Sequence, residues 1–234
     1  QGLERVVDRA VALGRSDAAQ LSVLCLPALA HALLPGAAAR LLQASPHARL
    51  SVTPQESPLL EEWMSAQRFD LGLGEQTATP PGTQAEVLLT LDEVAVLPAE
   101  HALAMRPVLG LGDFAGLPFV SLSADDPYRR QIDALFAQAG VQRQLRLETH
   151  SAVAVCAMVQ QGLGVAIVNP LTALAAVQGS GGALVLRRLA FSVPFSVSVV
   201  RPLFRAPLPE VAPMLGALRL ETRALVERFG EMVG

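Results

Sequence analysis

The chain has 234 residues and a formal net charge of −3; 51% of its residues are hydrophobic and only 17% are charged. Such a composition is typical of compact α/β packing with one large core or two small ones, and it argues against a disordered chain. No basic run is present that could meet a phosphate backbone, so the chain is not expected to bind DNA by itself. Neither a membrane-spanning apolar segment nor a secretory signal is visible.

The first third of the chain alternates between strand and helix patterns. The predicted elements are, in order, a short amphipathic helix at 3–13, a strand at 21–26, a helix reaching Leu42, a strand at 49–53, a helix opening at Ser57-Pro58 and a strand at 69–75. Ser57 is expected to cap its helix and Pro58 to occupy the first helical position. Three strands joined by two helices predict right-handed crossovers and a parallel sheet.

The apolar run at 87–97 is too long for one ordinary strand and carries Asp92 and Glu93 in its middle. We interpret it as a strand that leaves one sheet near 90–93 and enters another. A strand at 195–200 is expected to make the return crossing. The chain is therefore predicted to form two lobes with a hinge between them.

The second lobe is predicted from a second alternating pattern. Its expected elements are a strand at 118–121, a helix capped at Asp125-Asp126 with Pro127 at its start and ending at Gln138, a strand at 145–147, a helix opening at 149–151, a strand at 165–168, a helix from Leu171 and a strand at 184–189. A helical tail at 207–229 closes the chain.

The segment His150–Ala173, HSAVAVCAMVQQGLGVAIVNPLTA, is the most informative stretch. Its helix carries a buried stripe of Ala152, Val155, Cys156 and Val159, and Gly162 is suited to end it in the left-handed conformation. Two helix starts, at 150–151 and 169–171, would favour a small anion if topology brings them to one crevice. The alternative is a piece of α/β core that binds nothing.

This segment resembles the second half of the effector-binding domain of LysR-type transcriptional regulators. The stretches LPGAAARLLQASP and FDLGLGE are similar to the opening of that domain, and the NPLTA ending is most similar to members concerned with amino acids. The resemblance implies an α/β fold of two Rossmann-like lobes joined by two crossing strands, like type II periplasmic binding proteins. It assigns 1–15 to the end of a linker helix, 16–91 and 200–234 to the first lobe, and 92–199 to the second.

The resemblance also implies an effector pocket between the lobes. Carried over residue by residue, its lining is Pro27, Ala28, Leu29, Ser123, Tyr128, His150, Ser151, Asn169, Pro170 and Thr172. The expected partners are a small, amino-acid-like effector and further copies of the chain, as a dimer or as a tetramer of the full-length protein. DNA would be bound only through an N-terminal helix-turn-helix head. The protein is expected in the cytoplasm, without contact to a membrane.

No constellation of catalytic residues is evident. The four histidines have no partner at metal-ligand spacing, and the GxG pairs at Gly72 and Gly162 lack a third glycine, so no metal, cofactor or enzyme activity is expected. Cys25 and Cys156 lie in apolar runs and are interpreted as buried thiols. Glu61 and Glu62 are interpreted as a solvated helix face.

Two charged groups of residues leave alternatives open. The carboxylates Asp125, Asp126 and Glu56 are either caps and surface groups or a site for an ammonium group, and Arg129 and Arg130 are either a solvated face or partners for a carboxylate. Two other protein classes also remain: a two-lobed solute-binding protein of a transporter, and a small-molecule enzyme such as a ring-closing or decarboxylating one.

Overall fold

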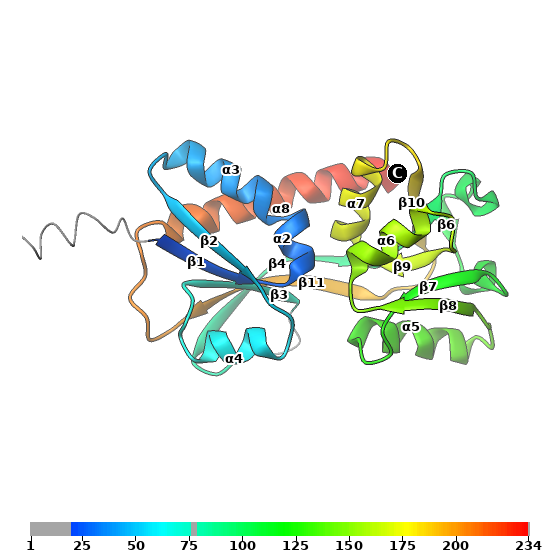
Figure 1. The fold of residues 1–234 in the computed structure, drawn as a ribbon, viewed down its shortest axis with the longest axis horizontal. Coiled ribbons are helices and arrows are strands. Elements are labelled where there is room, and N and C mark those ends of the chain that lie inside the picture. The colour runs from blue at the N-terminus through cyan, green and yellow to red at the C-terminus, as the bar shows by residue number, and fades with distance from the viewer. Residues whose placement is uncertain (1–19, 76–78, 234) are drawn as a thin grey trace, which may run out of the picture.

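A computed structural model describes residues 20–75 and 79–233 of the protein. The helix predicted at 3–13 lies outside the described residues. Two α/β lobes lie end to end, and two strands pass between them (Figure 1).

The first lobe is built on a five-stranded sheet in the order β2-β1-β3-β11-β4. Its strands are β1 (Gln20–Cys25), β2 (Arg49–Pro54), β3 (Leu71–Glu75), β4 (Thr83–Asp92) and β11 (Pro194–Pro202), and its helices are α2 (Pro27–Ala32), α3 (Leu34–Ala44), α4 (Leu59–Ser65) and α8 (Val211–Val233). Strands β1, β2 and β3 are parallel, which confirms the two predicted crossovers, and β11 runs antiparallel to β3 and β4.

The second lobe combines a four-stranded sheet, β6-β10-β5-β9, with the parallel pair β7-β8. Its strands are β5 (Val94–Pro98), β6 (Val108–Leu109), β7 (Pro118–Leu122), β8 (Gln144–Thr149), β9 (Ala166–Val168) and β10 (Leu184–Leu189); its helices are α5 (Pro127–Gln138), α6 (Ala152–Gln160), α7 (Pro170–Gly179) and the 3-10 turns η1 (Ala102–Met105) and η2 (Leu111–Phe114). A parallel bridge between Phe119 and Val165 joins the two sheets.

Gly164 makes that junction possible. Its φ is +154°, and a Cβ atom there would lie 2.6 Å from the carbonyl oxygen of Pro118. The absence of a side chain lets the backbone of Val165 bond to both Pro118 and Val120 on β7. A glycine at this position is therefore required for the second lobe to have one continuous sheet.

The core of each lobe follows the apolar pattern of the sequence. One cluster fills the first lobe, and two clusters cover the opposite faces of the sheet in the second. The stripe predicted on the helix that begins at Ser151 is confirmed, because Ala152, Val155, Cys156 and Val159 are all buried. An edge-to-face group of Phe114, Phe119 and Phe136 holds the far side of the second lobe.

The hinge lies where two antiparallel strands cross between the lobes. β4 ends at Asp92 and β5 begins at Val94, so the break predicted near 90–93 is confirmed, with Glu93 as the linking residue. The backbone N–H of Glu93 donates to the carbonyl of Val193 at 2.9 Å. All of β11, from Pro194 to Pro202, pairs with β3 or β4, and Val193 lies directly before it.

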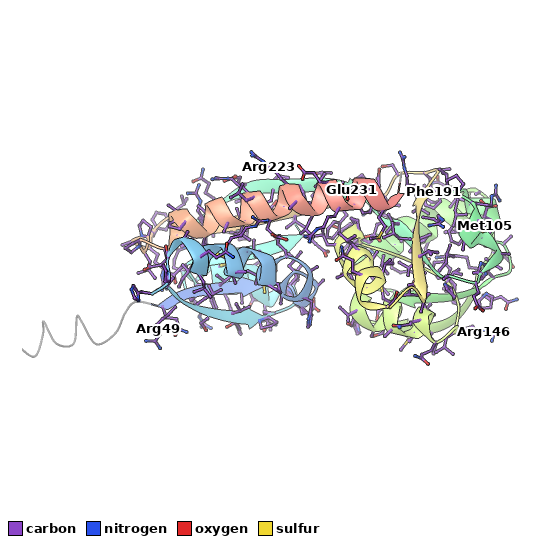
Figure 2. The ribbon with its side chains drawn as sticks, turned by 90° about the horizontal axis from the view of Figure 1, so that it is seen from above. Arg49, Met105, Arg146, Phe191, Arg223 and Glu231 are labelled. Carbon is purple, nitrogen blue, oxygen red and sulfur yellow. The ribbon has the colours of Figure 1, made fainter. Side chains whose placement is uncertain are left out.

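Helix α8 runs alongside both lobes, as the view from above shows (Figure 2). Met214 and Leu218 are buried in the first lobe. Near the other end, Phe229 and Met232 pack against the core clusters of both lobes. The helix therefore forms a continuous contact across the hinge.

Several local predictions were wrong. Ser57 does not cap a helix backbone, because its hydroxyl donates to the Glu61 carboxylate at 2.7 Å and α4 begins only at Leu59. The helix predicted to reach Leu42 is α3, which ends at Ala44, and the short helix α2 before it was not predicted. Pro35, near the start of α3, has no N–H to continue α2 into α3. The last helix begins at Val211 rather than at 207.

Candidate functional site

A cavity of about 480 Å³ lies between the lobes. It is reached by the carboxyl ends of β1, β3, β7, β8 and β9, which is where open α/β sheets bind their ligands. Its wall comprises Leu26, Pro27, Ala28 and His31 after β1; Glu56, Ser57 and Glu61 near α4; Glu75 and Glu93; Leu122 and 125–128 at the start of α5; 150–153 at the start of α6; and Asn169.

Three helices of the second lobe start at this cavity, each with a side-chain cap. Asp126 accepts from the N–H of Arg129 at 2.9 Å, Ser151 from that of Ala154 at 3.3 Å, and Asn169 from that of Thr172 at 2.8 Å. The caps predicted from the sequence at Asp126 and Ser151 are confirmed. The two helix starts at 150–151 and 169 line one crevice, which was the condition for an anion-binding role.

The cavity wall is strongly acidic. Six carboxyl groups line it, from Glu56, Glu61, Glu75, Glu93, Asp125 and Asp126, whereas no arginine is among the described lining residues. Among the described lining residues, the only basic side chains are those of His31 and His150. The Nδ1 atom of His150 lies 3.8 Å from a carboxylate oxygen of Asp125. The negative charge of the wall favours a ligand with a positive group over a ligand with only negative groups.

The carboxyl groups of Glu75 and Glu93 have raised pKa values and therefore resist ionisation. Burial, together with Asp126 and Glu56, raises the pKa of Glu75 from 4.5 to about 8. Burial raises the pKa of Glu93 well above its usual range, and the nearby Glu75 and Asp126 raise it further. Burial also raises the pKa of Glu56, against the opposing effect of His150. Such perturbed acids in a cleft are typical of functional sites.

Tyr128 joins the second lobe to the crossing strand. Its ring packs on Phe195 of β11 with centroids 5.6 Å apart. Burial, with the nearby Glu75 and Glu93, raises the pKa of the Tyr128 phenol, and a hydrogen bond with the backbone of Ser196 opposes that rise. The phenol therefore stays protonated beside the two acids and is a donor within the cleft.

The ten residues predicted for the pocket separate into two groups. Six line the cavity: Pro27, Ala28, Tyr128, His150, Ser151 and Asn169. Four are not part of its wall: Leu29, Ser123, Pro170 and Thr172. Leu29, Pro170 and Thr172 are buried inside helices α2 and α7, and Ser123 holds the loop before α5 through backbone bonds to Thr149 and Asp126.

Sequence reasoning missed the acids at the hinge. The sequence placed Glu75 at a strand end and Glu93 inside an apolar run without giving either a role, and it assigned Glu61 to a solvated face. In the structure, one Glu61 carboxylate oxygen is buried in the cavity wall and has no hydrogen-bond partner among the described residues. The signal available was a glutamate inside the apolar run at 87–97. Arg129 is also not solvated, because it is buried and bonded to Asp133, Glu148 and the carbonyl of Leu122.

Among the described residues, no group of three or more His, Cys, Asp or Glu is arranged to hold a metal ion. Cys25 and Cys156 are free and buried, and burial raises the pKa of both thiols to about 12. None of the helices in the described part of the chain has the length and apolar character needed to cross a membrane.

The arrangement defines a class of protein. Two α/β lobes, two crossing strands and an acidic cleft at the strand ends form a ligand-binding domain like those of type II periplasmic binding proteins. The family model "LysR substrate binding domain" matches residues 14–223, and the chain belongs to that family. The family consists of transcriptional regulators, and the solute-binding alternative is not favoured.

The relatives agree with this assignment. The chain is 46% identical over 225 residues to the transcriptional activator protein LysR of Escherichia coli, covering 96% of this chain and 71% of the relative. The crystal structure of HinK, a LysR family regulator from Pseudomonas aeruginosa, is 22% identical with a TM-score of 0.72 and covers 94% of this chain and 76% of that one. The effector-binding domain of BenM with its effector benzoate is 17% identical with a TM-score of 0.68, covering 88% and 92%. The two structures show that the fold is shared.

Proposed function

We propose that this chain is the sensing domain of a transcriptional regulator and that it binds a small metabolite in the cleft between its lobes. The observation that carries the proposal is the cavity itself, which is enclosed by both lobes and adjoins the two strands that cross between them. A ligand that contacts both lobes binds one inter-lobe angle more tightly than others and shifts the population towards it.

The effector is proposed to be amino-acid-like. The N-terminus of α6 offers backbone N–H groups beside Ser151, and Asn169 uses its carbonyl oxygen for capping, so its amide nitrogen is available as a donor. These groups suit a carboxylate. The acidic groups on the other side of the cavity suit an ammonium group. Pro27, Ala28 and Tyr128 would contact the rest of the ligand, and Leu29, Ser123, Pro170 and Thr172 would support the contacting residues from behind.

The domain is proposed to act in an oligomer and in the cytoplasm. In the full-length regulator, paired copies would pass the change in lobe angle to helix-turn-helix heads that contact DNA. The net charge of −3 and the acidic cleft would repel the DNA phosphate backbone. They therefore support the proposal that another part of the regulator contacts DNA.

A ligand screen tests the proposal. The purified chain would be screened by thermal shift against the twenty amino acids, simple diamines and simple carboxylates, and each hit would be titrated by isothermal calorimetry. A ligand present at about 100 times its Kd should add about 2.7 kcal/mol to the folded state, which is a clear thermal shift. Ser151→Ala should weaken the binding of a carboxylate ligand. If no compound of any charge stabilises the chain, the proposal fails.

A further inference from the structure

Glu93 occupies an unusual position for a charged residue. It is 1% exposed, lies at the crossing between β4 and β5, and forms part of the cavity wall. Its Oε2 atom is buried, and no hydrogen-bond partner for it is found in the described part of the chain. A buried polar atom without a partner costs the folded state free energy unless a bound group satisfies it.

Among residues 20–75 and 79–233, the titratable neighbours of Glu93 include no cation. The titratable groups that face it are Glu75 on β3, Asp126 ahead of α5, Tyr128 on α5 and Cys156 on α6. Each of these is neutral or negative. The nearest charges therefore oppose ionisation of Glu93, and none of the described residues places a compensating positive charge beside it.

A cation would satisfy this oxygen, and an organic cation fits the site better than a metal ion does. No metal-binding cluster of His, Cys, Asp or Glu is formed by the residues that the structure describes, so the carboxyls are too dispersed for a coordination shell. An ammonium group on a flexible small molecule needs only one or two carboxylate contacts and tolerates the rest of the cavity. The volume of about 480 Å³ is within the usual range for such ligands.

Building on the proposed function, we propose that the effector carries an ammonium group that binds between Glu93 and Glu75 at the hinge end of the cleft. The group donates to the orphaned Oε2 of Glu93 and to the Glu75 carboxylate, with the Tyr128 hydroxyl as a neighbour. Because the N–H of Glu93 is bonded to Val193, this contact acts on both crossing strands at once. The ammonium is thereby sensed directly at the hinge.

The contact couples binding to proton release. Without ligand, the raised pKa of Glu75, about 8, keeps that carboxyl mostly protonated at neutral pH, and burial likewise raises the pKa of Glu93 well above its usual range. An arriving ammonium group favours the carboxylate form and expels a proton to solvent. Affinity for a cationic ligand should therefore rise as the pH rises towards about 8.

The experiment compares ligands that differ by one amine. Affinities would be measured by calorimetry for L-lysine, L-norleucine, 6-aminohexanoate, 1,5-diaminopentane and adipate, together with any hit of the screen and its deaminated analogue. The best ligand should carry an ammonium group, and its deaminated analogue should bind at least about tenfold more weakly. Titrations in buffers of different ionisation enthalpy should show protons released at neutral pH.

The Glu93→Gln variant locates the effect. Glutamine resembles the protonated acid, so the variant should fold and be at least as stable as the parent at neutral pH. It should nevertheless bind the ammonium ligand at least about tenfold more weakly and release fewer protons. Glu62→Gln is the matched control, because it makes the same side-chain replacement at an exposed site on α4 outside the cavity wall and should change neither property.

The outcomes separate this inference from the proposed function. Binding by ammonium-free compounds alone, or equal binding of the cation by parent and Glu93→Gln, overturns the inference and leaves a metabolite-sensing domain. Absence of binding by every compound overturns both.

Discussion

Raising the pH should destabilise the ligand-free protein through Glu75. Its pKa is raised from 4.5 to about 8 in the folded state, so between these values the folded chain holds more protons than the unfolded one. Stability is then fully present below about pH 4.5 and is lost as the pH rises to about 8. The loss from this one carboxyl is about 5 kcal/mol, which is a large share of the 5–15 kcal/mol typical of a folded protein.

Urea unfolding followed by the fluorescence of the single tryptophan, Trp63, measures this loss. The free energy of unfolding would be determined at several pH values from about 5 to 8.5 for the parent, Glu75→Gln and the exposed control Glu62→Gln. Over this pH range, the free energy of unfolding of Glu75→Gln should fall by much less than that of the parent, and the difference should be most of the predicted loss. The control should follow the parent. Parallel profiles for the parent and Glu75→Gln would refute the reasoning, because they would mean that burial does not hold this carboxyl neutral.

Other predictions test the scaffold around the site. Gly164→Ala should destabilise the protein by more than about 2 kcal/mol in urea unfolding, because its Cβ would meet the carbonyl of Pro118 at 2.6 Å. An unchanged midpoint would contradict the proposed close approach. Asp126→Ala should cost about 1 kcal/mol through loss of a helix cap, and Asp126→Asn should restore most of it. The thiols of Cys25 and Cys156, with pKa values of about 12, should react with a thiol reagent only after unfolding; rapid labelling of the native chain would show that they are accessible.

Much of the fold follows from local sequence rules. The helix opened by Asp126 and Pro127 was predicted with its correct end at Gln138, because the cap, the proline and the apolar spacing all agree. The break in the run at 87–97 was predicted from length and from the charged pair inside it. The error at Ser57 arose because its hydroxyl bonds to another side chain, and the separate helix α2 that precedes Pro35 was not predicted.

The candidate site was harder to predict for a physical reason. The helix starts at Ser151 and Asn169 carry a local signature, and both line the cavity. Glu75 carries no such signature and Glu93 carries only its place in an apolar run, because their burial and their mutual influence arise from strands that meet only in three dimensions. A glutamate in an apolar run indicates that a partner is needed, but sequence alone does not say which group provides it.

The central claim is that a bound metabolite changes the angle between the lobes. Spin labels at Arg49→Cys and Arg146→Cys would report that angle, because these exposed residues lie on the same side of the molecule, one on each lobe (Figure 2), and both native cysteines are buried. Addition of a saturating ligand should shorten and narrow the distance distribution, and Glu93→Gln should require more ligand for the same shift. An unchanged distribution, with calorimetry showing the site filled, would contradict the account.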